Sequence, residues 1–447
     1  MRQPSRSRSP GHHSRPGEPL GASYQGRYVT WGRRRGARRA HHAAGRAQGA
    51  LRTDTVVTQH LNTISRVGVV GLGTIGAQEL ALWQRAGLQP IGYDISEARA
   101  RVPGGSTRVE DLDPADALVL CLPNLAPSGE NSMAAFDHFI DMAQRLSPRE
   151  RLVVIASTVP IGFTRHLAER LGHHGRVVSH APERFDPGRG TELGEIPRVV
   201  GALTEQALDA TLALYARAKV PTHRVEPVEV AEASKLLENS FRLVNISFIN
   251  EFAELCRRMG IVAADVIDAA ATKPFAFMAH QPGVGAGGTC IPTMPRYLLD
   301  AARQNGIEMP ILRDAVDGNE QVVNRVAEHV QQMLSTGENR RARVLVVGAT
   351  YKPNYPDARA SAAVAFARGL ARRHDVVVYD PIVDRDGFPD ELPLVRELPQ
   401  GERFDAVVIA LKHRDTDIAA LRQMSPILMD LVRGAVEATE SISSRNR

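Results

Sequence analysis

Cysteine is scarce in this sequence, and long apolar runs are missing from it. Only three of the 447 residues are cysteine, at positions 121, 256 and 290. They are odd in number and lie far apart, which argues against a disulfide framework and for a reducing compartment. No stretch approaches 18 consecutive apolar residues, so we expect no membrane-spanning helix and no membrane partner. Together these features predict a cytoplasmic protein.

Lysine and acidic residues are almost absent from the first 60 residues. This segment holds 12 Arg, no Lys, and only Glu18 and Asp54 as acidic residues, whereas the rest of the chain is mildly acidic. The overall net charge of +5 therefore gives a misleading picture of the body of the chain. A nucleic-acid partner is not expected, because the body lacks a basic excess.

The Arg-rich segment has few large apolar residues and no helical or strand period. We interpret residues 1–63 as a disordered extension. It lacks the apolar core of a secretory signal. Two alternatives remain: a targeting or nucleic-acid-binding role for the arginines, and a translation start placed upstream of a natural one near Val57.

From residue 64 to about 220, short apolar runs alternate with helical stretches. The segment "RVGVVGLGTIGAQELALWQRAGLQPIGYD" has a β-α-β pattern. The later runs "ALVLCLP", "LVVIAST", "RVVSHAP" and "RVVGA" resemble further strands. Alternation of this kind predicts a parallel sheet with helices on both faces.

A long helical period follows from Val228 and ends at Gly260, which has the position of a C-cap glycine. Apolar residues recur along it at steps of three or four, and we expect this stripe to be buried. Its members are Leu237, Phe241, Val244, Phe248, Phe252 and Leu255. Residues 221–336 are therefore predicted to form a mainly helical central domain.

After "STGENRR", which we interpret as a linker, "ARVLVVGATYK" opens a second β-turn-α pattern. Residues 337–447 are expected to form another α/β domain. The predicted fold class is α/β, with two Rossmann-like parallel-sheet domains joined by a central, mainly helical domain that contains one long helix.

Gly71, Gly73 and Gly76 have the spacing G-x-G-x-x-G between a predicted strand and a predicted helix. These glycines permit a tight turn, the approach of a pyrophosphate and close packing of helix on strand. Asp94 ends the next strand, where an acid accepts from ribose hydroxyls and favours NAD over NADP. A glycine turn that binds no ligand is the alternative.

Polar residues at later strand ends are candidates for chemistry. Thr158 and Glu183 each follow a predicted strand, at the edge where parallel sheets bind ligands. Lys235 and Asn239 lie four residues apart on the long helix, and Arg242 continues their face. A lysine and an amide that face a cleft can stabilise an oxyanion. A turn-capping hydroxyl, a solvated carboxylate and a solvent-facing helix stripe are the structural alternatives.

Cys290 differs from the other two cysteines. Cys121 and Cys256 sit at apolar positions of a strand and a helix and are interpreted as core residues. Cys290 follows "QPGVGAGG", a glycine-rich run whose N–H groups can approach a diphosphate. A thiol on such a loop is a candidate covalent catalyst when nearby cations lower its pKa. No metal site is expected.

The chain resembles the UDP-glucose/GDP-mannose dehydrogenase family, especially its bacterial branch that oxidises UDP-N-acetylhexosamines. The resemblance covers about residues 66–415. The stretches that carry it are "GLGTIG", "STVP", "APERFDPG", "EASKLLENSFRLVNISFINEFAELCRRMGI", "ATKPFAFM", "GVGAGGTCIP" and "GATYKPNYPDARAS".

The resemblance implies oxidation of a sugar C6 alcohol to a carboxylate with two NAD and an enzyme thiol. Cys290 matches that thiol, and Lys235 and Asn239 match its oxyanion-stabilising pair. Thr158 and Glu183 match residues around the catalytic water and the substrate. For NAD, the resemblance implies the positions Gly71, Gly73, Thr74, Ile75, Gly76, Asp94, Pro123, Thr158 and Arg359. For the nucleotide sugar, it implies Gly285, Gly287, Gly288 and Lys352, together with Glu183, Lys235 and Asn239.

The resemblance also implies the roles of the domains. Residues 64–220 would bind NAD, residues 221–336 would dimerise through the long helix and carry the Cys290 loop, and residues 337–447 would bind the nucleotide sugar. A homodimer is therefore expected.

The chain departs from the family pattern at Met294, where the family has an aspartate that orders water and handles protons. A methionine does neither well. Thr74-Ile75 replace the usual Tyr-Val, and Asn124 replaces the usual threonine. Three hypotheses follow: the full four-electron oxidation, which we favour; a two-electron oxidation of a nucleotide sugar or nucleoside that stops at the aldehyde; and a nucleotide-sugar-binding protein without catalysis.

Overall fold

The computed structural model describes residues 64–125, 132–172, 177–186, 192–334, 341–385 and 387–438. All of them belong to one compact unit of the chain, Gly49–Arg447. The predicted disordered extension and nearly all of the predicted linker lie outside the described residues. Among the helices of the described ranges, none is both long and apolar enough to cross a membrane.

The first sheet has the strand order β3-β2-β1-β4-β5-β6-β7-β8. Its strands are β1 (Arg66–Val70), β2 (Gln89–Tyr93), β3 (Gly105–Ser106), β4 (Ala117–Leu120), β5 (Leu152–Ile155), β6 (Val177–His180), β7 (Arg198–Ala202) and β8 (Thr222–Arg224). Neighbours run parallel except for β6 and β7, which are antiparallel. The predicted parallel sheet is therefore confirmed, with one reversal near its edge.

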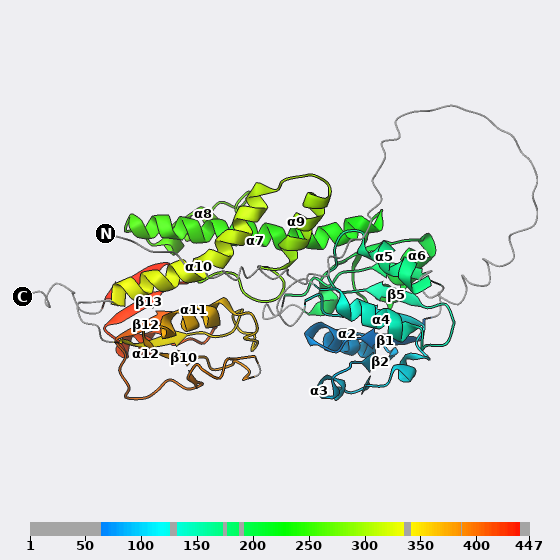
Figure 1. Ribbon diagram of the computed structural model, residues 1–447, viewed down its shortest axis with the longest axis horizontal. Coiled ribbons are helices and arrows are strands. Elements are labelled where there is room, and N and C mark those ends of the chain that lie inside the picture. The colour runs from blue at the N-terminus through cyan, green and yellow to red at the C-terminus, as the bar shows by residue number, and fades with distance from the viewer. Residues whose placement is uncertain are drawn as a thin grey trace, which may run out of the picture. The chain divides into compact units, whose positions relative to one another are not determined.

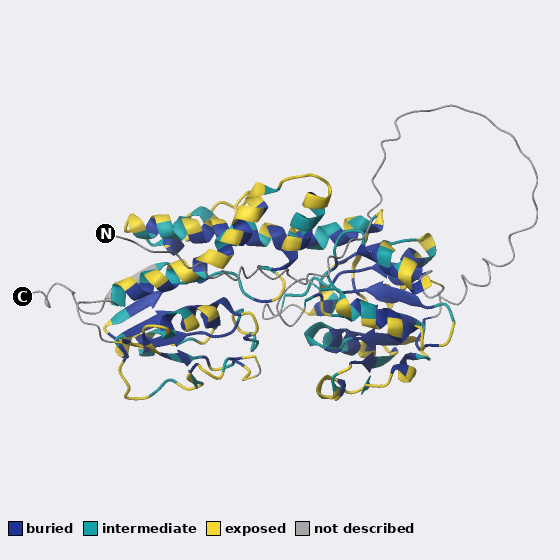
Figure 2. Cartoon of the chain, in the orientation of Figure 1, coloured by how far each residue is buried: buried dark blue, intermediate teal, exposed yellow. Residues whose placement is uncertain are grey.

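Helices cover both faces of this sheet (Figure 1). On one face, α2 (Thr74–Arg85) and α6 (Glu205–Arg217) contribute Trp83 and Tyr215 to a buried cluster. On the other face, α4 (Ala134–Ala143) and α5 (Phe163–Leu171) contribute Phe136 and Phe163. The central strands are consequently buried on both sides, as Figure 2 shows in dark blue, which explains their continuous apolar sequences. A short helix, α3 (Glu97–Ala100), and 3-10 helices at Val109–Leu112 and Leu193–Glu195 also belong to this part.

The long helix predicted from Val228 is α7 (Val228–Arg258), and Gly260 follows its end with φ of 70°. It is followed by α8 (Ala263–Ala271), α9 (Met294–Gln304) and α10 (Pro310–Leu334). A glycine accepts this left-handed conformation without strain, so the predicted C-terminal signal is confirmed.

The predicted buried stripe of α7 is wrong. Leu237 and Phe248 are each 63% exposed, and Phe241 and Leu255 are also exposed. The buried face instead carries Leu236, Asn239, Ser240, Leu243, Ser247 and Asn250. Helices α9 and α10 pack on this second face, and its polar groups find partners there, as when Ser247 Oγ donates to the Ala315 carbonyl at 2.7 Å.

The second sheet has the order β11-β10-β9-β12-β13-β14. Its strands are β9 (Arg343–Val347), β10 (Asp375–Tyr379), β11 (Leu394–Val395), β12 (Ala406–Ile409), β13 (Ile427–Asp430) and β14 (Ala435–Ala438). All neighbours are parallel except β13 and β14. Helix α11 (Ala362–Ala371) and the end of α10 pack on one face, and α12 (Ile418–Gln423) packs on the other. The predicted second Rossmann-like α/β fold is therefore confirmed.

Candidate active site

Four predicted residues or turns, and also Asn124, lie at the carboxyl edge of the first sheet. Asp94 follows β2, Gly71 follows β1, Asn124 follows β4, Thr158 follows β5 and Glu183 follows β6. The strand order places these ends side by side. Two adjacent ends are also tied together, because the Glu183 N–H donates to the Ala156 carbonyl at 2.9 Å. The topology therefore builds one continuous polar edge.

The glycine turn after β1 has the geometry that a dinucleotide requires. Gly71 has φ of 90°, and a Cβ added at Gly76 would lie 1.7 Å from the Gly71 carbonyl oxygen. A Cβ at Gly73 would meet nothing within 4 Å, so space is open in front of this residue. The N-terminus of α2 receives no side-chain cap. Its N–H groups and the open space fit a pyrophosphate.

Asp94 supports the same turn from β2. Its buried carboxylate accepts from the Leu72 N–H and from the Ser96 N–H, each at 2.8 Å. Each carboxylate oxygen keeps acceptor capacity for a ribose hydroxyl. Thr74 and Ile75 begin α2 and are half-buried, whereas Pro123 follows β4 and is exposed.

Cys290 lies in the loop that precedes α9 and is exposed. Protein groups nevertheless surround the thiol and remove much of its hydration. This loss of hydration raises the pKa of the Cys290 thiol above its ordinary value, while Lys235 acts in the opposite direction and Glu183 raises it further. The three predicted groups are therefore close enough to influence one another's charge.

Glu183 and Asn239 each carry a buried polar atom without a hydrogen-bond partner among the described residues. These atoms are Glu183 Oε1 and Asn239 Nδ2. Burial raises the pKa of Glu183, and Lys235 and Arg198 oppose that shift. Asn239 is only 5% exposed, so its face of α7 is turned inward and does not form a solvent stripe. A buried acceptor and a buried donor without partners each fit a site that a polar ligand completes.

Met294 occupies the position where an acid was expected. It is 3% exposed and packs with Leu236 and Tyr297 in a small apolar cluster. Asn124 Nδ2 donates to the Thr158 carbonyl at 2.8 Å and lies 3.4 Å from the Met294 sulfur. The Tyr297 hydroxyl donates to the Asn124 carbonyl at 2.8 Å. Two of the departures from the family pattern, Asn124 and Met294, are therefore neighbours in the fold.

The glycines of the Cys290 loop are needed for close packing. A Cβ at Gly285 would lie 2.9 Å from Val322, and one at Gly288 would lie 2.7 Å from the Tyr351 ring. A Cβ at Gly287 would lie 2.9 Å from the Ala360 carbonyl oxygen.

Three N–H groups of the same glycine-rich stretch have partners within the protein. Gly288 donates to the Ala360 carbonyl at 3.0 Å, Ala286 donates to Asn319 Oδ1 at 2.7 Å, and Gly283 donates to Asn250 Oδ1 at 2.9 Å. The glycine-rich composition thus reflects tight contacts with α7, α10 and the segment after β9.

The two predicted basic residues of the second Rossmann-like part have acidic partners. Lys352 Nζ pairs with Asp186, which follows β6, and Arg242 Nη2 lies 3.9 Å from the same carboxylate. Arg359 is exposed and its Nε donates to both carboxylate oxygens of Asp357 at 3.0 Å. Lys352 therefore reaches the same polar edge as Glu183, whereas Arg359 is held at its own loop.

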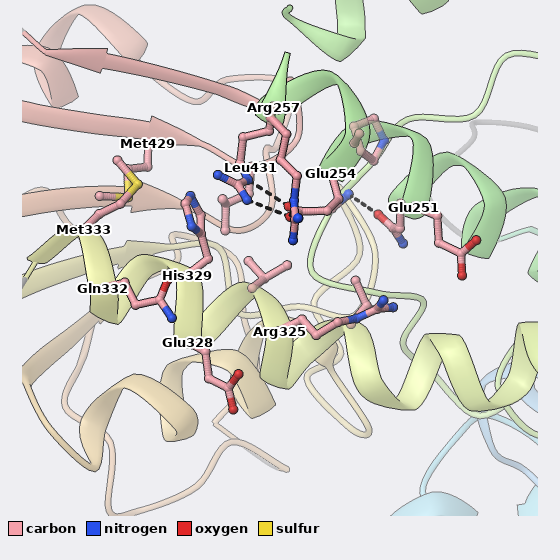
Figure 3. A pocket seen from close by; sticks show the side chains of 18 residues that line it. Glu251, Glu254, Arg257, Arg325, Glu328, His329, Gln332, Met333, Met429 and Leu431 are labelled. Carbon is pink, nitrogen blue, oxygen red and sulfur yellow. Dashed lines mark hydrogen bonds and ion pairs between the residues drawn. The ribbon is translucent and has the colours of Figure 1, made fainter. Parts of the chain in front are cut away.

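Two cavities border the Cys290 loop. One, of about 240 Å³, is lined by Gln281–Ala286 together with Thr350, Tyr351 and Lys412. The other, of about 390 Å³, lies between α7, α10 and β13 (Figure 3). In the larger cavity Glu254 is paired with Arg257 and Arg258, and further charged residues of both signs line its walls. None of Cys290, Lys235 or Glu183 lines either cavity, so these three groups lie outside both.

Sequence reasoning did not single out Asp186 or Tyr355. Asp186 was visible inside "APERFDPG", but its pairing with Lys352 joins residues 166 positions apart. The Tyr355 hydroxyl lies 3.1 Å from Thr74 Oγ1, across 281 positions. Contacts of this kind join residues that are distant in the sequence, so no local sequence pattern predicts them.

Two family models match the chain. The central domain of the UDP-glucose/GDP-mannose dehydrogenase family matches residues 229–321, and the UDP binding domain of the same family matches residues 345–433.

Similar proteins and structures cover most of the chain. A UDP-N-acetyl-D-mannosamine dehydrogenase of Pyrococcus horikoshii is 30% identical over 384 residues, which is 78% of this chain and 89% of that protein. An NDP-N-acetyl-D-galactosaminuronic acid dehydrogenase of Ralstonia solanacearum is 28% identical to this chain. The match covers 81% of this chain and 95% of that protein. The solved structure of a UDP-D-ManNAc dehydrogenase from Pyrococcus horikoshii has a TM-score of 0.72 at 27% identity and covers 83% of this chain and 96% of that one.

Proposed function

Because the chain belongs to the UDP-glucose/GDP-mannose dehydrogenase family, and is thus a nucleotide-sugar dehydrogenase, we propose that it oxidises the C6 alcohol of a nucleotide sugar to the carboxylate through Cys290. The relatives named above act on N-acetylated sugars. A UDP-N-acetylhexosamine is therefore the first substrate to test, with UDP-hexoses next.

The proposed reaction uses Cys290 as a nucleophile. The alcohol loses a proton to the site and a hydride to the cofactor, which gives an aldehyde. The Cys290 thiolate would add to the aldehyde carbon. The adduct would then lose its hydroxyl proton to the site and a second hydride from its carbon, which gives the thioester. Water then cleaves the thioester, releases the carboxylate and restores the thiol. Two hydrides leave for each acid formed, so two cofactor molecules are reduced.

Lys235 and Asn239 are proposed to stabilise the negative oxygen in each tetrahedral state. Asn239 Nδ2 is buried and has no hydrogen-bond partner among the described residues. The amide therefore gives up no hydrogen bond within the protein when it donates to a developing negative charge. Lys235 already lowers the pKa of the Cys290 thiol, as a cation next to a thiolate does. Both residues lie on α7, and a helix is a rigid support for such donors.

Glu183 is proposed as the base that takes a proton from the attacking water, with Thr158 beside it on the next strand end. Its buried position raises the pKa of Glu183 above its ordinary value. A base with a raised pKa accepts a proton more readily near neutral pH.

NAD is the proposed cofactor, and it would accept the hydrides. The open space at Gly73, the uncapped start of α2 and the acid at position 94 fit its pyrophosphate and ribose. An acid at the end of β2 disfavours the additional phosphate of NADP. Gly71, Thr74, Ile75, Gly76, Pro123 and Arg359 are proposed to complete this site.

The nucleotide is proposed to bind where the Cys290 loop meets the second Rossmann-like part. The cavity of about 240 Å³ next to Tyr351 and Lys412 supports this placement. Lys352 is proposed to bind the substrate, and Asp186 would neutralise it until substrate arrives. Residues 64–220, 221–336 and 337–447 then form the NAD, central and nucleotide-sugar domains.

The observation that carries the proposal is the convergence of Cys290, Lys235 and Glu183 at one polar edge. The experiment is incubation with NAD and a panel of UDP-, GDP- and dTDP-sugars, with NADH counted optically and products identified by mass spectrometry. Formation of a uronic acid by the wild type and its loss in Cys290→Ala would support the proposal. Acid formation by Cys290→Ala would refute it.

A second candidate function is a two-electron oxidation that releases the aldehyde. The specific observation in its favour is the burial of Met294 in an apolar cluster, where an acid would otherwise order water. One NADH for each aldehyde would support it.

The exposed apolar stripe of α7 supports a homodimer. Leu237, Phe241, Phe248 and Leu255 lie along one side of the helix and are 49% to 63% exposed. A contiguous apolar surface of this kind is typical of an interface. We propose that a second copy of the chain covers it.

A further inference from the structure

The second Rossmann-like part reaches the dinucleotide turn through one tyrosine. The Tyr355 hydroxyl lies 3.1 Å from Thr74 Oγ1, within hydrogen-bond distance. Thr74 is the first residue of α2 and directly follows Gly73, in front of which the space is open. The phenol therefore meets the turn at the helix end that would receive a pyrophosphate.

Tyr355 is held firmly by its own domain. The neighbouring Asn354 has φ of 59°, a left-handed conformation that turns the chain. Its N–H donates to His413 Nδ1 at 3.0 Å, and its Oδ1 accepts from the Arg414 N–H at 2.8 Å. His413 Nε2 lies 3.0 Å from the buried carboxylate of Asp380, which ties the turn to the end of β10. These hydrogen bonds fix the backbone turn that carries Tyr355.

The same tyrosine contacts the Cys290 loop through a second ring. The rings of Tyr351 and Tyr355 meet edge to face with centroids 5.8 Å apart. Tyr351 in turn packs so closely on Gly288 that a Cβ there would lie 2.7 Å from its ring. Thr74, Tyr355, Tyr351 and Gly288 therefore form a continuous chain of contacts, from the dinucleotide turn to a residue two positions before Cys290.

We propose that Tyr355 is a positioning residue of the dinucleotide site: through Thr74 it fixes the start of α2, so that NAD affinity depends on a hydroxyl supplied by the second Rossmann-like part. This inference rests on the proposed use of NAD. It assigns Tyr355 no part in the chemical steps, so the cofactor affinity should change and the maximal rate should not.

The test compares Tyr355→Phe with the wild type. This change removes the hydroxyl and keeps the ring that packs on Tyr351. Calorimetric titration with NAD alone should show a roughly two- to tenfold weaker dissociation constant, the size expected for one neutral hydrogen bond. The KM for NAD should rise by the same factor, with kcat within about twofold and an unchanged melting temperature. Tyr379→Phe, in β10 of the same domain, is the matched control and should bind NAD like the wild type.

A double-mutant cycle decides whether Tyr355 acts through Thr74. Thr74→Val should weaken NAD binding to a similar extent, and the double variant should be no weaker than either single variant. Losses that multiply in the double variant would overturn the inference, as would an unchanged NAD affinity in Tyr355→Phe or an equal loss in the Tyr379→Phe control. A wild type that binds NAD but oxidises no nucleotide sugar would refute the proposed function, while the affinity comparison would still decide the role of Tyr355.

Discussion

The side-chain amide nitrogen of Asn124 lies 3.4 Å from the sulfur of Met294. This contact joins the segment after β4 to the first residue of α9, one helical turn beyond Cys290. Met294 is buried against Leu236 and Tyr297, so its contribution at this position is apolar packing. The side chain therefore supports the helix start behind the cysteine.

The packing role of Met294 predicts how its variants behave. Met294→Leu conserves volume and should cost less than about 1.5 kcal/mol of unfolding free energy. Met294→Ala leaves a cavity and should cost about 2–5 kcal/mol. Chemical denaturation measures both, and NADH formation by Met294→Leu should stay within about threefold of the wild type. A loss of activity on the order of 100-fold in a stably folded Met294→Leu would show that the sulfur takes part in the reaction.

The thiol of Cys290 should react in a strongly pH-dependent manner. Its pKa is raised by the loss of hydration, so the fraction of thiolate should grow about tenfold for each pH unit between 7 and 9. Labelling with iodoacetamide, read by peptide mass spectrometry, should follow that slope. Lys235→Met should slow labelling at fixed pH, because Lys235 lowers the thiol pKa.

Cys256 is the internal control for this labelling, since it is buried in α7 and should react only after unfolding. A Cys290 labelling rate that is flat between pH 7 and 9, or unaffected by Lys235→Met, contradicts the described electrostatics.

The buried carboxyl group of Glu232 should make the stability of the folded protein depend on pH. It is fully buried in α7 and accepts from the Thr164 N–H at 2.8 Å and from Thr164 Oγ1 at 2.6 Å, at the start of α5. Burial raises its pKa to about 7. Its contribution to stability is therefore complete below its ordinary pKa near 4.5 and is lost as the pH rises through about 7.

Glu232→Gln removes this titration. Between pH 4.5 and 8 the unfolding free energy of the wild type should fall relative to that of the variant, by at most about 3.5 kcal/mol. Urea denaturation of both proteins at several pH values measures the difference. Parallel pH profiles would show that Glu232 titrates normally.

The exposed stripe of α7 predicts that a charge at its centre prevents association. Phe248 is 63% exposed in the single chain, and a second copy would desolvate it. Phe248→Glu should yield a monomer in analytical ultracentrifugation at concentrations where the wild type is a dimer. Ile95→Glu introduces the same charge at another exposed apolar residue, at the first sheet, and should remain a dimer. A wild type that sediments as a monomer would refute the proposed interface.

Much of the fold could be predicted from the sequence, because its signals are local. Strands such as β4 and β5 are buried on both faces and appear as unbroken apolar runs. The span of α7 followed from its period and from Gly260. The buried face of α7 did not, because Ser247 and Asn250 become buried only by bonding to Ala315 and Gly283. The apolar residues Leu237 and Phe248 lie on the other face, which the described parts of the chain leave exposed.

In the candidate site, too, local features could be predicted from the sequence and long-range contacts could not. Thr158 and Glu183 could be placed at one edge because parallel strands end on the same side of a sheet. The pairing of Lys352 with Asp186 and of Tyr355 with Thr74 could not be anticipated, because each joins distant parts of the chain. The burial of Met294 in an apolar cluster likewise depends on the packing of two separate helices, α7 and α9.

The most direct test of the account is the number of NADH molecules formed for each molecule of oxidised sugar. The wild type should form two NADH for each uronic acid, and Cys290→Ala should form no acid while Cys256→Ala, altered at a buried cysteine away from the site, still does. One NADH for each released aldehyde, with the same result in Cys290→Ala, would contradict the proposal that Cys290 carries the sugar through a thioester.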